Sequence, residues 1–104
     1  MDYIRCMVDV RETPDFTDWL AALNDQRARL QIVRRISRVA AGNFGDAKSV
    51  GGAVSELRID HGPGYRVYYT RRGNTVVILL CGGHKRSQSK DIRKAREIAE
   101  ALEY

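Results

Sequence analysis

The apolar positions in the first part of the chain predict one strand followed by a short helix. Residues 3–10 alternate between apolar and polar side chains, which is the pattern of a strand with one buried face. Thr13 and Pro14 suit the cap and the first turn of a helix. The apolar residues that follow recur at helical spacing: Phe16, Trp19, Leu20 and Leu23.

A second helix is predicted over residues 26–41, capped by Asn24 or Asp25 and ended by Gly42 and Asn43. Its expected buried stripe consists of Ile32, Val33, Ile36, Val39 and Ala40. The two helices follow each other closely, so we expect a helical hairpin laid across one face of a sheet.

Three further strands are predicted at residues 53–60, 65–71 and 75–81, after a glycine-rich connector over residues 42–52. The sequence HGPG supplies the first turn, and Gly73-Asn74 supplies a two-residue hairpin turn. The last of these strands is apolar on both faces, so we expect it at the centre of the sheet, covered on both sides. Gly82-Gly83 is then expected to let the chain leave the sheet sharply.

The C-terminal stretch predicts a helix over residues 88–103, with Ser87 or Ser89 as its cap. Its inward-facing residues are Ile92, Ala95, Ala99 and Leu102. The element order is therefore βααβββα. This order predicts a single α+β domain over residues 1–104, with a mainly antiparallel four-stranded sheet, a helical hairpin and a C-terminal helix.

The formal net charge of +5 favours an anionic partner: nucleic acid, an acidic protein segment or, least of the three, a membrane surface. No apolar stretch is long enough to span a bilayer, and the alternating start does not have the pattern of a signal peptide, so we expect a cytoplasmic protein.

Cys6 and Cys81 are expected to be buried, reduced thiols, with a bridge between them as the lesser alternative. No metal-ligand spacing is present.

Basic residues gather on one face of the predicted sheet. By strand alternation Arg58 and Arg66 point to one polar side, and Tyr68 on that side is a platform on which a base can stack. The alternative is a solvated sheet face held together by pairs between Glu56 and the arginines.

More candidate chemistry follows the central strand. Histidine side chains can gain and lose a proton near neutral pH, so His84 is a candidate for proton transfer, although a lone histidine is more often an ordinary polar surface group. Lys85 and Arg86 form a basic cluster beside the last helix, whose backbone amides can add to a phosphate site. Lys48 lies in the glycine-rich connector.

The second helix carries five arginines: Arg27, Arg29, Arg34, Arg35 and Arg38. Three of them, Arg27, Arg34 and Arg38, lie along one side. They indicate either a solvated helix face or a contact for ribosomal RNA or an acidic partner.

Taken together, the element order, the opening TPDFTDWL, the strand sequence GPGYRVYY and the pattern GGxKxxQxxDI resemble the RelE/ParE superfamily of bacterial toxins, and within it the phage-derived, HigB-like branch. The resemblance covers nearly the whole chain. It implies a toxin of a type II toxin–antitoxin pair, neutralised by a helix-turn-helix antitoxin encoded by the adjacent gene. Operator DNA would be contacted only through the complex with that antitoxin.

The RelE-like members cleave mRNA, commonly on the ribosome and without a metal or other cofactor. By resemblance Arg66 matches the arginine that contacts the scissile phosphate, Lys85 the basic residue after the last strand, and Lys48, loosely, a basic residue before the second strand. The chain has His84 where the branch often has an acidic residue. It has Gln88 in the region where some members carry a tyrosine.

The first hypothesis is therefore a metal-independent endoribonuclease in which the 2′-OH of the RNA attacks the adjacent phosphate. Arg66 is assigned to the phosphate, with Arg58 and Lys85 assisting. Lys48 and His84 are alternative bases, and His84 is alternatively the acid. Arg86, Gln88 and Tyr68 are assigned to substrate binding. The rival hypotheses are a ParE-like inhibitor of DNA gyrase and a plain nucleic-acid-binding module. The nuclease hypothesis requires open, anion-sized space beside the Arg66 guanidinium.

Overall fold

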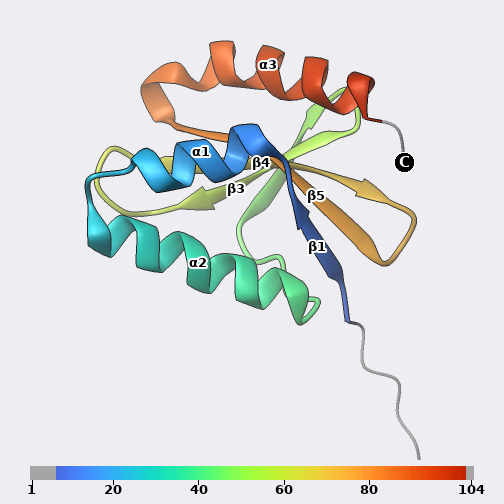
Figure 1. Cartoon of the computed structure of the whole chain (residues 1–104), viewed down its shortest axis with the longest axis horizontal. Coiled ribbons are helices and arrows are strands. Elements are labelled where there is room, and N and C mark those ends of the chain that lie inside the picture. The colour runs from blue at the N-terminus through green and yellow to red at the C-terminus, as the bar shows by residue number, and fades with distance from the viewer. Residues whose placement is uncertain (1–6, 103–104) are drawn as a thin grey trace, which may run out of the picture.

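The computed structural model describes residues 7–102, which form one mixed sheet between two layers of helix (Figure 1). The strands are β1 (Asp9–Glu12), β2 (Ala47–Gly51), β3 (Val54–Ile59), β4 (Tyr65–Arg72) and β5 (Val76–His84). Their spatial order is β1-β5-β4-β3-β2. β1 runs parallel to β5, and every other neighbouring pair is antiparallel. The α+β class and the mainly antiparallel sheet are thus confirmed.

The helices are α1 (Pro14–Ala22), α2 (Gln26–Ala40) and α3 (Gln88–Ala101), with a short 3₁₀ turn, η1 (Lys85–Ser87), before α3. Thr13 and Asp25 cap α1 and α2 as the sequence predicts. The Thr13 hydroxyl accepts from the Phe16 amide at 3.2 Å, and the Asp25 carboxylate accepts from the amide of Arg27 at 3.0 Å.

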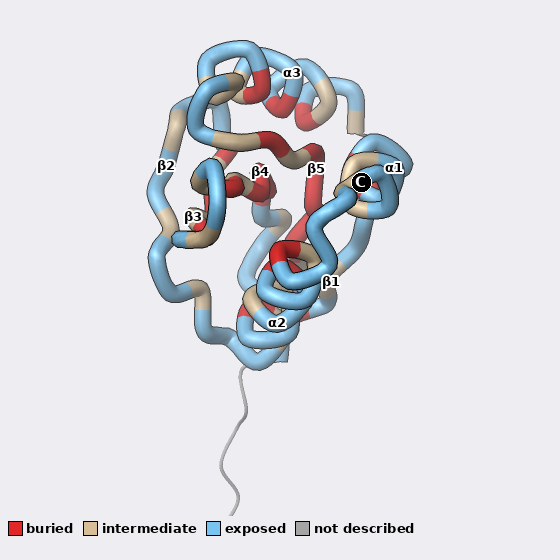
Figure 2. Tube along the Cα trace, turned by 90° about the vertical axis from the view of Figure 1, so that its left-hand side faces the viewer, coloured by how far each residue is buried: buried red, intermediate tan, exposed pale blue. Residues whose placement is uncertain are grey.

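Helices α1 and α2 pack on one face of the sheet and α3 packs on the other (Figure 1). The first layer centres on Phe16, Ile32 and Leu57, and the second on Ile78 and Ala95. The middle of β5 is buried against both layers, which confirms its predicted central place (Figure 2). Val33 was predicted to join the buried stripe of α2 but is 45% exposed, because the sheet reaches only the opposite side of this helix.

Four expectations about the strands were wrong. The glycine-rich connector contains β2, so the sheet has five strands rather than four. The first strand begins at Asp9 within the described residues, later than its predicted span of 3–10, of which residues 3–6 lie outside the description. Three residues, not two, join β4 to β5. Finally, β5 continues through the glycine pair to His84 instead of leaving the sheet there.

The glycine pair in β5 serves close packing on both sides of the strand. A Cβ on Gly82 would lie 2.2 Å from a ring atom of Trp19 in α1, and one on Gly83 would lie 1.8 Å from a carboxylate oxygen of Asp91 in α3. The Trp19 ring and the Asp91 carboxylate therefore lie directly against the strand backbone. Contacts this short leave no room for a side chain at either position.

Ser87 is the N-cap residue of α3, as the sequence predicts, but its hydroxyl makes no capping hydrogen bond to that helix. The hydroxyl instead accepts from the His84 amide at 3.2 Å and donates to the Asp91 carboxylate. This link ties the end of β5 to the first turn of α3.

Cys81 is a buried free thiol, and burial, followed by the charge of Asp91, raises its pKa to about 12. The alternative bridge to Cys6 lies outside the described residues. Between residues 7 and 102, no helix combines the length and the apolar character needed to cross a bilayer.

Candidate active site

Two arginines lie side by side on the α3 face of the sheet. Arg58 and Arg66 are direct partners in the β3–β4 ladder, so their side chains leave the same face at the same level. The Arg58 side chain is 35% exposed and the Arg66 side chain 14%. Like charges placed directly opposite each other repel, so this arrangement needs a neighbour that holds the pair together.

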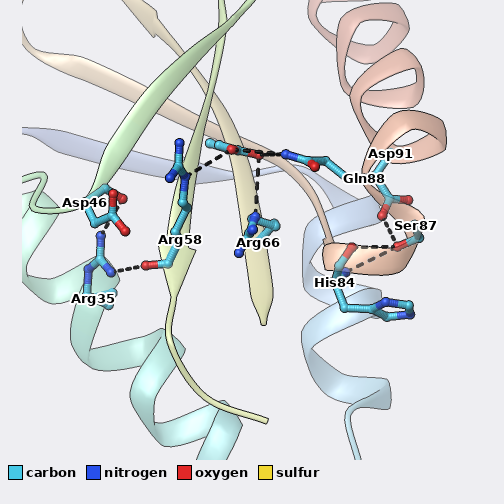
Figure 3. Close-up of polar contacts among 9 residues, drawn as sticks. Arg35, Asp46, Arg58, Arg66, His84, Ser87, Gln88 and Asp91 are labelled. Carbon is cyan, nitrogen blue, oxygen red and sulfur yellow. Dashed lines mark hydrogen bonds and ion pairs between the residues drawn. The ribbon is translucent and has the colours of Figure 1, made fainter. Parts of the chain in front are cut away.

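That neighbour is the carboxylate of Glu56, which is buried in the sheet face with a residue exposure of 1%. Its Oε1 lies 3.3 Å from Nε of Arg58, and its Oε2 lies 3.7 Å from Nε of Arg66. Gln88 of α3 donates its side-chain amide to both oxygens, at 3.2 and 2.9 Å (Figure 3). Three side chains therefore converge on one carboxylate.

An open cavity of about 290 Å³ is lined by residues that include both arginines. Its wall includes Arg58, Arg66 and Lys85 as cations, Asp46 and Asp60 as anions, and the backbone of Gly64. Arg66 thus pairs with the Glu56 carboxylate and is also one of the residues that line this cavity.

Lys85 reaches the cavity because the end of β5 is held against the β3–β4 turn. The Lys85 amide donates to the carbonyl of Gly64 at 2.9 Å. Gly64 has φ +81°, and a Cβ there would lie 3.5 Å from Cβ of Lys85 and 3.7 Å from Nη1 of Arg66. A glycine suits this backbone conformation at no steric cost.

The opposite wall is fixed by Arg35 of α2, which the sequence grouped with the arginines of a solvated face or a contact surface. Its guanidinium donates to the carbonyls of Phe44 at 3.0 Å and Asp46 at 3.2 Å, and also to the carbonyl of Arg58 (Figure 3). Arg35 is therefore a structural residue that holds the start of β2 beside β3 and keeps Asp46 at the rim of the cavity.

Residues 18–103 match the family model described as Phage derived protein Gp49-like (DUF891). The chain belongs to this family. An uncharacterized protein of Haemophilus influenzae is 47% identical over 95 residues, which cover 91% of this chain and 96% of that protein.

The solved structure of a mutant of the E. coli toxin RelE in the free state has the same fold, with a TM-score of 0.71. The alignment covers 92% of this Gp49-like chain and 99% of the RelE chain, at 14% sequence identity. This likeness shows that the Gp49-like chain has a RelE-like fold.

The Gp49-like fold brings together several of the residues singled out from the sequence. Arg58, Arg66 and Lys85 line one cavity. Lys48 is exposed on β2 and pairs with Glu56 in the ladder, so it lies on the same sheet face. Arg86 follows Lys85 in η1 and is exposed.

Three other predicted site residues do not join this cavity. His84 pairs with Tyr65 in the ladder and therefore lies on the α1 face of the sheet, away from Arg66 (Figure 3). Tyr68 is fully buried beneath α3, so its prediction as a stacking platform was wrong. Gln88 turns its side chain to Glu56 rather than to the open space.

Burial is also the main cause that raises the pKa of the Tyr68 hydroxyl, followed by the charges of Glu56 and Asp91. A tyrosine in this setting stays protonated at neutral pH. It contributes packing to the floor of the site.

Sequence reasoning did not select Asp46, Asp60 or Gly64 as site residues. Asp60 lies two residues after Arg58 in the predicted strand, so alternation places both side chains on the same face. This alternation could have identified Asp60 as a site residue. Asp46 and Gly64 lie in turns and connectors whose spatial neighbours are set only by the closure of the sheet.

The cavity offers cations for a phosphate and carboxylates that can accept a proton. Arginine suits a phosphate because its planar fork can bond two oxygens at once. Among residues 7–102, no group of histidine, cysteine and carboxylate side chains is arranged to hold a metal ion.

Proposed function

We propose that this chain is the toxin of a type II toxin–antitoxin pair and acts as a cytoplasmic, metal-independent endoribonuclease on mRNA, in association with the ribosome. The observation that carries the proposal is the pair of adjacent guanidinium groups, with Lys85, around an open cavity in a RelE-like fold. A HigB-like assignment within the superfamily is part of the same proposal.

In the proposed reaction the 2′-OH of the RNA attacks the adjacent phosphorus, and the bond to the 5′-oxygen breaks. The products are a 2′,3′-cyclic phosphate and a 5′-hydroxyl end, and the protein supplies no nucleophile. Arg58 and Arg66 stabilise the charge that builds on the phosphate oxygens, and Lys85 protonates the departing 5′-oxygen. The proton of the 2′-OH passes to a carboxylate at the rim, Asp46 or Asp60, or to Lys48 on the same sheet face.

Inducible expression followed by mapping of transcript ends tests this proposal. We expect growth arrest with new 5′ ends inside coding frames, and cleavage by the purified protein in the presence of translating ribosomes. A DNA damage response without new RNA ends would instead indicate a gyrase inhibitor. Normal growth would indicate a plain nucleic-acid-binding module.

The proposed toxin function implies an antitoxin partner, and the Gp49-like family match and the RelE-like fold support this part of the proposal. We propose a helix-turn-helix protein encoded by the adjacent gene, which bridges the toxin to operator DNA.

The outer face of α2 suits such a partner, since Leu30 is 50% and Val33 45% exposed on this helix. Beside them run the exposed Arg27, Arg34 and Arg38, and α2 contains no acidic residue. An acidic segment with apolar side chains complements this face better than RNA does.

Leu30→Lys is expected to weaken binding of the adjacent gene product by at least about tenfold, because it removes an apolar contact and adds a cation to the face. Met7→Lys is the matched control, since Met7 is also an exposed large apolar residue but lies before β1. Titration of each purified variant with the partner measures the affinity. Equal affinities for wild type and Leu30→Lys would contradict this docking face.

A further inference from the structure

Glu56 is one of two buried carboxylates among residues 7–102, and no step of the proposed reaction uses it. The other, Asp91, has an evident structural role in linking α3 to the end of β5 through Ser87. Glu56 lies instead directly beneath the two arginines that border the cavity. Burying a charge costs free energy unless the charge is paired and hydrogen-bonded, so a buried Glu56 is expected to have a structural or functional role.

The geometry divides each guanidinium into two edges. Arg58 and Arg66 both turn Nε toward Glu56, and their Nη atoms donate no hydrogen bond to another group within residues 7–102. The Nη1 atom of Arg66 lies near Gly64, on the wall of the cavity. One edge of each arginine thus serves the protein, and the other remains available to an anion.

We propose that Glu56 is a positioning residue that holds Arg58 and Arg66 parallel and offers their outer edges to one phosphate group of an RNA chain. It overcomes the mutual repulsion of the two cations and restricts their rotamers before the substrate arrives. Gln88 keeps the carboxylate in place from α3 and satisfies both of its oxygens. This role rests on the proposed nuclease function of the same site.

This role predicts that Glu56→Gln lowers turnover without weakening the binding of the RNA substrate. The glutamine keeps the size of the side chain, but its amide points donor hydrogens at groups that are themselves donors. It also removes a negative charge near a polyanion. We therefore expect turnover on RNA to fall by about 10- to 100-fold. We expect binding of a fluorescent single-stranded RNA to stay equal or tighten at constant salt.

A purely structural role would lower turnover and binding together, in proportion to the folded fraction. Glu97→Gln on α3 is the control, since it removes one exposed carboxylate far from the cavity, and it is expected to behave as wild type. Glu56→Asp keeps the charge but withdraws the carboxylate by one methylene. It is expected to lose turnover as well, and it tests the inference if the glutamine variant does not fold.

Nuclear magnetic resonance of the arginine Nε–H groups gives a readout that does not depend on cleavage. Wild type is expected to show separate signals for Arg58 and Arg66, assigned with the variants Arg58→Lys and Arg66→Lys. Glu56→Gln is expected to move both signals to the position of unrestrained arginines. If wild type cleaves no RNA but these shifts occur, the nuclease proposal fails while the positioning of the arginines stands. If Glu56→Gln cleaves like wild type with unchanged arginine signals, the inference is overturned.

Discussion

Arg66→Ala is expected to abolish toxicity and to lower RNA cleavage by about 10²–10³-fold, the usual effect of removing one group that stabilises transition-state charge. Arg66 is the more enclosed of the two arginines, with its side chain 14% exposed, and borders the cavity next to Gly64 and Lys85. The fold should persist, because Glu56 keeps Arg58 and Gln88 as partners. Cleavage assays and thermal unfolding measure the two effects.

Arg66→Lys separates the charge from the shape of the side chain. Lysine keeps a cation but lacks the planar fork, so we expect an intermediate loss of activity. Arg71→Ala is the control from the same strand, since Arg71 is exposed and stacks over Phe44 at 4.6 Å, away from the cavity. A folded Arg66→Ala protein with wild-type toxicity would remove the basis of the proposed site.

Gly83→Ala is expected to destabilise the protein by about 3 kcal/mol, the upper part of the range for overpacking. Its new methyl group would lie 1.8 Å from Oδ2 of Asp91 and 3.0 Å from the Ser87 hydroxyl. Relief requires the Asp91 and Ser87 side chains to shift, which disturbs their hydrogen bond beside η1, and η1 carries Lys85. Activity should therefore fall even in the molecules that remain folded. Chemical denaturation and cleavage assays measure these losses.

A double-variant cycle identifies the cause of this loss. In an Asp91→Ala background the carboxylate that meets the new methyl group is absent, so Gly83→Ala should cost less than half of what it costs in wild type. Additive costs would show that the close approach of Asp91 is not the reason for glycine. Gly73→Asn is the control, since Gly73 has φ +63° and a Cβ there meets nothing within 4 Å.

Local patterns in the sequence predicted most of the elements. Three such patterns were confirmed: capping by Thr13 and Asp25, the helical spacing of apolar residues, and the apolar residues on both faces of β5. Each pattern depends only on residues a few positions apart. The β2 strand was not predicted because it lies in a glycine-rich segment and most of its residues are exposed. Although β2 pairs with β3, its sequence therefore lacks the alternation of apolar and polar residues that predicts a strand.

The candidate site was predicted only in part, because its members meet through long-range register. Alternation placed Arg58 and Arg66 on one face, and their pairing in the β3–β4 ladder confirms it. Alternation did not show that α3 covers Tyr68, or that His84 belongs to the other face after β5 runs on past its glycines. The first outcome depends on how α3 docks and the second on the length and register of β5, which no local pattern specifies.

The amino-acid sequence by itself determined the helices, most of the strands, the α+β class and the alignment of two arginines, because these follow from contacts between residues close along the chain. Only the tertiary structure decided that the two guanidinium groups share a buried carboxylate and border open space. The walls of this site come from β2, the β3–β4 turn and the start of α3, which are distant in the sequence. The contacts that bring these segments together are long-range, so no local pattern in the sequence specifies them.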